Sequence, residues 1–85
     1  MSSELEILDQ LLGGDQSLAL VRPLFETEDR FVRSTMAMLD AKEVRLLDND
    51  GAEVPRWRWR GVLTAAAERG DFRLAITQLG AGRIG

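Results

Sequence analysis

The stretch that decides the fold is residues 43–60, EVRLLDNDGAEVPRWRWR, because two segments of alternating side chains flank a turn. In a β-strand, successive side chains point to opposite faces. Residues 56–60 alternate arginine and tryptophan, so a strand there would place three arginines on one face and both tryptophans of the chain on the other. The stretch therefore predicts a β-hairpin with one apolar and one basic face.

The turn of this hairpin is expected at Asp50-Gly51, because a two-residue turn needs backbone conformations that aspartate and glycine tolerate. Gly51 should therefore have a positive φ. With this turn, Val44 faces Trp57 on the apolar side of the hairpin. The turn type and the apolar pairing agree, and together they set the expected register.

Three segments before the hairpin have the apolar spacing of amphipathic helices. The first covers residues 3–12 and ends at a pair of glycines. The second begins near Asp15 and is stopped by Pro23, which lacks an amide donor. The third begins after Thr27, whose side chain can cap a helix, and ends near Lys42.

After the hairpin, the sequence predicts a fourth helix over residues 62–69, which Gly70 ends, and a third strand over residues 71–77 beside the hairpin. Residues 78–85 are rich in glycine, and we expect them to fray. All elements are expected to form a single domain over residues 1–85, because a chain of this length buries one thin core.

The predicted fold class is α+β, with three N-terminal helices packed on a small antiparallel sheet. Two helices joined by a short turn and followed by a hairpin make residues 15–60 resemble a winged helix in pattern. The resemblance implies a small DNA-binding regulator whose third helix enters the major groove. That helix, however, begins with Glu26, Glu28 and Asp29, which would meet the negative potential of DNA.

The residue composition argues against most enzymes. The chain contains no histidine, cysteine or tyrosine, which excludes Ser-His and Cys-His nucleophile pairs and zinc sites with nitrogen or sulfur ligands within one chain. We therefore expect a protein that is not an enzyme and that needs no cofactor and no metal.

The overall balance of residues is that of a globular domain, with 45% apolar and 29% charged residues. No apolar run approaches the roughly 20 residues of a membrane span, so no membrane contact is expected. The first residues lack the basic and apolar pattern of a signal peptide. Without cysteine, nothing requires an oxidising compartment, and we expect a cytoplasmic protein.

Charge is distributed unevenly along the chain. Residues 1–42 contain eight acids and four bases, whereas residues 43–85 contain six acids and seven bases. In the expected register Arg45 faces Arg56, and like charges directly opposite each other destabilise a sheet. An anionic partner would explain this, and the alternative is a solvated face with weak ion pairs. The candidate binding residues are Arg30, Arg33, Arg45, Arg56, Arg58 and Arg60.

Trp57 and Trp59 are expected in the core, where each would bury roughly 200 Å². The alternative is an exposed platform on which bases or a partner could stack. We interpret the chain as a small non-catalytic module that binds a protein partner, or a second copy of itself, through the arginine-rich sheet face and the third helix. The alternative function is that of a winged-helix regulator that binds nucleic acid.

Overall fold

The computed structural model describes the chain from residue 3 to residue 84, with the side chains of residues 3, 4, 66–68 and 84 left aside. Helices surround a small three-stranded antiparallel sheet, so the fold class is α+β, as the sequence predicts. In chain order the elements are α1 (Ser3–Leu11), β1 (Gln16–Ser17), α2 (Leu18–Val21), the 3-10 turn η1 (Arg22–Leu24), α3 (Glu28–Asp40), β2 (Val44–Leu47), η2 (Arg56–Arg58), α4 (Trp59–Thr64), η3 (Ala66–Asp71), β3 (Arg73–Ile76) and α5 (Gln78–Ile84).

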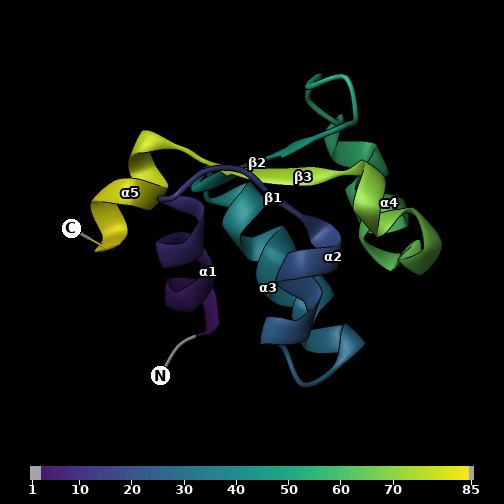
Figure 1. Cartoon of the computed structure of the whole chain (residues 1–85), viewed down its shortest axis with the longest axis horizontal. Helices are drawn as coiled ribbons and strands as arrows, with labels where there is room; N and C mark the ends of the chain where they lie inside the picture. The colour runs from purple at the N-terminus through teal and green to yellow at the C-terminus, as the bar shows by residue number, and fades with distance from the viewer. Residues whose placement is uncertain (1–2, 85) are drawn as a thin grey trace.

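The sheet has the order β1-β3-β2, and both pairs are antiparallel. Val44 lies opposite Ile76 and Leu46 opposite Leu74, so these four side chains share one face. Figure 1 shows α1, α2 and α3 on one side of the sheet, with α4 beyond one end of the strands and α5 beyond the other. Several of the largest fully buried side chains come from these helices and strands: Ile7, Leu8, Leu18, Phe31, Met38, Leu46, Leu63 and Leu74.

Helix α3 begins and ends as its sequence predicts. Thr27 caps the helix by accepting a hydrogen bond from the main-chain nitrogen three residues further on (3.2 Å). At the other end, Lys42 has a φ of 62° and its nitrogen binds the oxygen of Leu39 (3.1 Å), while the nitrogen of Glu43 binds the oxygen of Met38 (3.0 Å). These two bonds form a Schellman cap, which turns the chain from α3 directly into β2.

The predicted turn is present, but it contains three residues rather than two. The main-chain nitrogen of Asp48 binds the oxygen of Ala52 (2.8 Å), which leaves residues 49–51 as the loop. Gly51 has a φ of 84°, so its predicted positive φ is confirmed. The Asp48 carboxylate fastens the loop by accepting hydrogen bonds from the nitrogens of Asp50 (2.9 Å) and Ala52 (3.0 Å).

The extra loop residue shifts the pairing by one position, so the predicted register is wrong. Leu47 bridges to Glu53, and the nitrogen of Val54 binds the oxygen of Leu46 (2.8 Å). A slip of one residue moves every side chain of a strand to the other face. A strand continued in this register would therefore turn the arginines of residues 56–60 toward the core.

The chain instead leaves the sheet at Pro55, so the prediction of a long second strand up to residue 60 is wrong. Proline has no amide donor for a strand ladder. Its oxygen accepts a hydrogen bond from the nitrogen of Arg58 (2.9 Å), which closes the first helical turn. The helical path that follows, through η2 and α4, buries Val62 and Leu63.

The predicted third strand is confirmed as β3, which is the central strand of the sheet. Its neighbour β1, which we did not predict, is only two residues long. Strands β1 and β2 both pair with β3, which lies outside residues 15–60. That range therefore forms no sheet of its own, and its resemblance to a winged helix is not confirmed.

The glycine-rich end of the chain forms helix α5 rather than a frayed tail as far as residue 84. Gly80 is packed closely, because a Cβ atom there would stand 2.2 Å from the main-chain oxygen of Glu43. Thr77 joins the same region: its hydroxyl donates to the oxygen of Lys42 (2.6 Å) and accepts from the nitrogen of Gly80 (3.2 Å). Helix α5 is thereby held against the start of β2.

A cluster of three charged side chains joins η1, α3 and η3. The Arg69 side chain is buried, and its guanidinium binds the Glu28 carboxylate and the oxygen of Leu63 (3.2 Å) above the ring of Phe31 (5.1 Å). Arg22 binds the other oxygen of Glu28 (2.8 Å). Hydrogen bonds from Arg69 and then from Arg22 lower the pKa of Glu28 from 4.5 to about 2.

Candidate functional site

The six candidate arginines do not share a sheet face, so the predicted arginine-rich face is wrong. Only Arg45 lies on a strand, and its side chain is exposed. The three arginines of residues 56–60 belong to η2 and α4, where residues two positions apart point in different directions. Arg30 and Arg33 are exposed on α3.

Three of these arginines bind acids within the chain. The predicted repulsion between Arg45 and Arg56 is therefore wrong, because each guanidinium faces a carboxylate instead. All three pairs are largely exposed, and pairs of this kind contribute about 0–1 kcal/mol each. The pairs are Arg33–Asp29 (3.1 Å), Arg45–Glu53 (3.3 Å) and Arg56–Asp40 (2.7 Å).

The two tryptophans lie in different environments. Trp57 is 83% exposed, so its predicted burial is wrong. Trp59 is half-buried against the core, and its indole nitrogen donates to the main-chain oxygen of Val54 (3.0 Å). The guanidinium of Arg56 lies 5.7 Å from the centre of the Trp59 ring, within range of a cation–π contact. Trp59 therefore contributes to the packing of the fold, whereas Trp57 faces the solvent.

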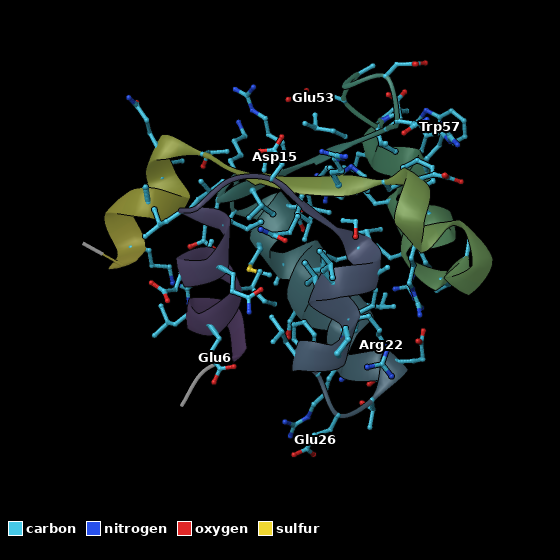
Figure 2. All side chains as sticks on the ribbon, viewed as in Figure 1. Glu6, Asp15, Arg22, Glu26, Glu53 and Trp57 are labelled. Atoms are coloured by element: carbon cyan, nitrogen blue, oxygen red, sulfur yellow. The ribbon has the colours of Figure 1, made fainter. Side chains whose placement is uncertain are left out.

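Arg58 and Arg60 follow this exposed indole in the sequence, and both are themselves exposed. Within the part of the chain that the structure describes, neither forms an ion pair. We call Trp57, Arg58 and Arg60 the tip patch. Figure 2 places Trp57 at the outer margin of the molecule, on the same side as Glu53, which follows the loop. The tip patch thus combines a large apolar side chain with two positive charges that no described acid compensates.

A groove of about 880 Å³ lies over β2, β3 and the segment that follows the loop. Val44, Leu46 and Trp59 contribute apolar surface to it. The carboxylates among its lining residues, Asp40 and Glu53, are each bound to an arginine. The groove therefore combines apolar surface with two ion pairs among its lining residues.

The exposed side of α3 carries charges of both signs. Arg30 and Arg33 lie beside Asp29, and Glu26 is exposed just before the helix. Glu28 is held by two arginines, which keeps its negative charge at the start of α3. The helix that a winged-helix protein would insert into DNA therefore begins with acidic groups.

Two kinds of site are absent from the described residues. Among their side chains, no group of three histidine, cysteine or acidic residues is placed to hold a metal ion. Within residues 3–84, no helix has the length and apolar character needed to cross a membrane.

Our reasoning from the sequence missed one exposed apolar surface. Leu5 and Leu12 of the first helical segment are 42% and 51% exposed. A signal for this was present, because five apolar residues between positions 5 and 12 are more than one side of a short helix can bury.

Comparison with known proteins gives this site no precedent. No protein-family model, no curated protein sequence and no solved structure matches the chain. The function must therefore be argued from the residues themselves.

Proposed function

We propose that this chain is a small non-catalytic module that binds a protein partner through the tip patch. The observation that carries the proposal is the 83% exposure of Trp57. Burial of an indole of roughly 200 Å² in an interface gains about 5 kcal/mol before the entropy of association is subtracted. Tryptophan and arginine are also the residue types most enriched at the energetic centres of protein interfaces.

The charges around Trp57 indicate the chemistry of the partner. Arg58 and Arg60 have no acidic partner among the described residues, so a partner's carboxylates could bind them without breaking an existing ion pair. Arginine can bind a carboxylate with two parallel hydrogen bonds. The partner surface that fits best is an apolar patch flanked by acidic side chains.

Binding to nucleic acid is the alternative, and the surface supports it less well. The loop beside the tip patch and the residues next to it carry Asp48, Asp50 and Glu53, and α3 begins with Glu28 and Asp29. Phosphates approaching either region would meet negative charge. Arg58 and Arg60 are too few to reverse the sign of the surrounding surface.

The test compares the wild-type chain with Trp57→Ala and with Arg58→Glu/Arg60→Glu in pull-downs from nuclease-treated cell extract. A protein that the wild type retains is identified by mass spectrometry, purified and titrated against each variant. Arg30→Glu/Arg33→Glu is the matched control, because it changes the net charge equally on another exposed surface. We expect Trp57→Ala to weaken the purified complex by about 30-fold, the loss typical of an interface centre.

Equal affinity of the wild type and Trp57→Ala for the purified partner would overturn the proposal. A loss confined to Arg30→Glu/Arg33→Glu would overturn it as well, because the binding surface would then be α3. Duplex DNA is titrated in parallel at several salt concentrations. Tight binding that weakens steeply with salt and is lost with the tip patch would favour the nucleic-acid alternative instead.

A further inference from the structure

Helix α1 presents an apolar strip to the solvent on the side away from the core. Leu5 and Leu12 are 42% and 51% exposed, whereas Ile7, Leu8 and Leu11 between them are buried. About half of the surface of these two leucines therefore stays in water when the chain is folded. Their apolar surface is available for an intermolecular contact.

Two acids lie on the same outer side of α1. Positions 5, 9 and 12 follow helical spacing, so Asp9 stands between the two leucines, and Glu6 stands beside them. Both acids are exposed, and within the described part of the chain neither forms an ion pair. We call Leu5, Glu6 and Asp9 of α1, together with Leu12 directly after it, the outer α1 face.

The outer α1 face complements the tip patch in both polarity and charge. The tip patch has an exposed indole and two guanidinium groups, the outer α1 face has two exposed leucines and two carboxylates, and none of these charged groups forms an ion pair with a described residue. We propose that the partner of the tip patch is the outer α1 face of a second copy of this chain. This inference rests on the proposed function, because it names the occupant of the same patch.

The two surfaces lie too far apart to meet within one molecule. Figure 2 shows Glu6 at the lower left of the view and Trp57 at the upper right. The molecule measures 32 × 28 × 21 Å along its principal axes. Contact between two different surfaces is head-to-tail, so an open assembly keeps one free surface of each kind at its two ends and grows with concentration. The small area involved makes the contact weak and transient.

The test is sedimentation velocity of the full chain at rising protein concentration and low ionic strength. We expect the average mass of the wild type to rise well above that of the 9.5 kDa monomer. It should return to the monomer value in about 1 M salt, where charges are screened beyond about 3 Å. Two charge reversals, Arg58→Glu/Arg60→Glu and Glu6→Lys/Asp9→Lys, should each remain monomeric.

An equimolar mixture of these two variants distinguishes the proposed contact from general charge effects. In the mixture, the negative tip patch of one variant can bind the positive outer α1 face of the other, and the two unchanged surfaces can bind as in the wild type. Association should therefore be restored to at least half the mass increase of the wild type. Two controls of equal net charge, Arg30→Glu/Arg33→Glu and Asp15→Lys/Glu26→Lys, should associate like the wild type. A mixture that stays monomeric while the wild type associates would overturn the inference.

A wild type that stays monomeric at every concentration would also overturn this inference, but not the proposed function. The proposed function then depends on whether Trp57→Ala weakens the complex with a purified partner. Conversely, association that survives in Trp57→Ala and in both charge reversals would show that copies meet elsewhere. The two proposals can therefore fail separately.

Discussion

Trp57 and Trp59 are separated by one residue, yet one indole contacts solvent and the other contacts protein. The Trp59 side chain packs on the core and donates a hydrogen bond to Val54, whereas 83% of Trp57 is exposed. Exposed side chains away from caps and ion pairs usually change stability by less than about 0.5 kcal/mol when replaced. The two residues should therefore respond differently to the same substitution.

We expect Trp57→Ala to leave the free energy of unfolding within about 0.5 kcal/mol of the wild-type value. Trp59→Ala should lower it by about 2–3 kcal/mol, because it removes half-buried apolar surface and leaves the oxygen of Val54 without its donor. Urea denaturation followed by circular dichroism measures both values. Equal losses in the two variants would contradict the assignment of roles.

Lys42 is the described residue other than glycine with a positive φ, at 62°. A side chain in this conformation is strained by roughly 1 kcal/mol relative to glycine. We expect Lys42→Gly to raise the free energy of unfolding by about 0.5–1 kcal/mol, because glycine is the residue preferred at this position of a Schellman cap. Lys42→Ala, which removes the same charge but keeps a Cβ atom, should give no such gain in thermal denaturation.

At the scale of elements, the features that the sequence predicted correctly are those that depend on residues close to each other in the chain. The cap at Thr27, the positive φ of Gly51 and a strand within residues 71–77 follow from local chemistry, and all three are confirmed. The site could not be predicted in the same way. The faces on which Trp57 and the arginines lie depend on one extra loop residue, and the Asp48 carboxylate stabilises that longer loop.

Helix α5 is a second element that local sequence did not predict. Its glycines predict fraying, whereas its packing against a distant segment stabilises a helix. Gly80 and Gly82 belong to this one helix, but only Gly80 is close to another segment. We expect Gly80→Ala to lower the free energy of unfolding by about 1–3 kcal/mol, since the new Cβ atom would collide with the oxygen of Glu43.

Gly82→Ala is the matched control in the same helix. Its Cβ atom would meet no described atom within 4 Å, and alanine favours a helix over glycine by up to about 1 kcal/mol. Thermal denaturation should therefore give shifts of opposite sign for the two variants. A similar shift for both would show that α5 is not docked at Glu43.

At the scale of the whole molecule, the cluster of Glu28, Arg69 and Arg22 makes stability depend on pH. The folded protein holds the pKa of Glu28 at about 2, below the ordinary value of 4.5, so the unfolded chain binds a proton more readily. The stabilisation is therefore complete above pH 4.5 and is lost as the pH falls toward 2.

We expect Glu28→Gln to be less stable than the wild type at pH 7, and the difference should narrow as the pH falls from 4.5 toward 2. Urea denaturation at a series of pH values measures this difference. Glu26→Gln is the control, because Glu26 is exposed and forms no ion pair with the described residues. A constant difference between Glu28→Gln and the wild type at all pH values would contradict the role of the cluster.

The central strand of the sheet is almost the last element of the chain, and this order has a consequence during synthesis. Strands β1 and β2 both pair with β3, so neither pair can form until β3 has been translated. Until residue 76 has left the ribosome, the apolar sides of the three N-terminal helices have no complete sheet to cover them. A nascent chain stalled at residue 60 should therefore remain sensitive to protease, and protection should arise in one late step after β3 emerges.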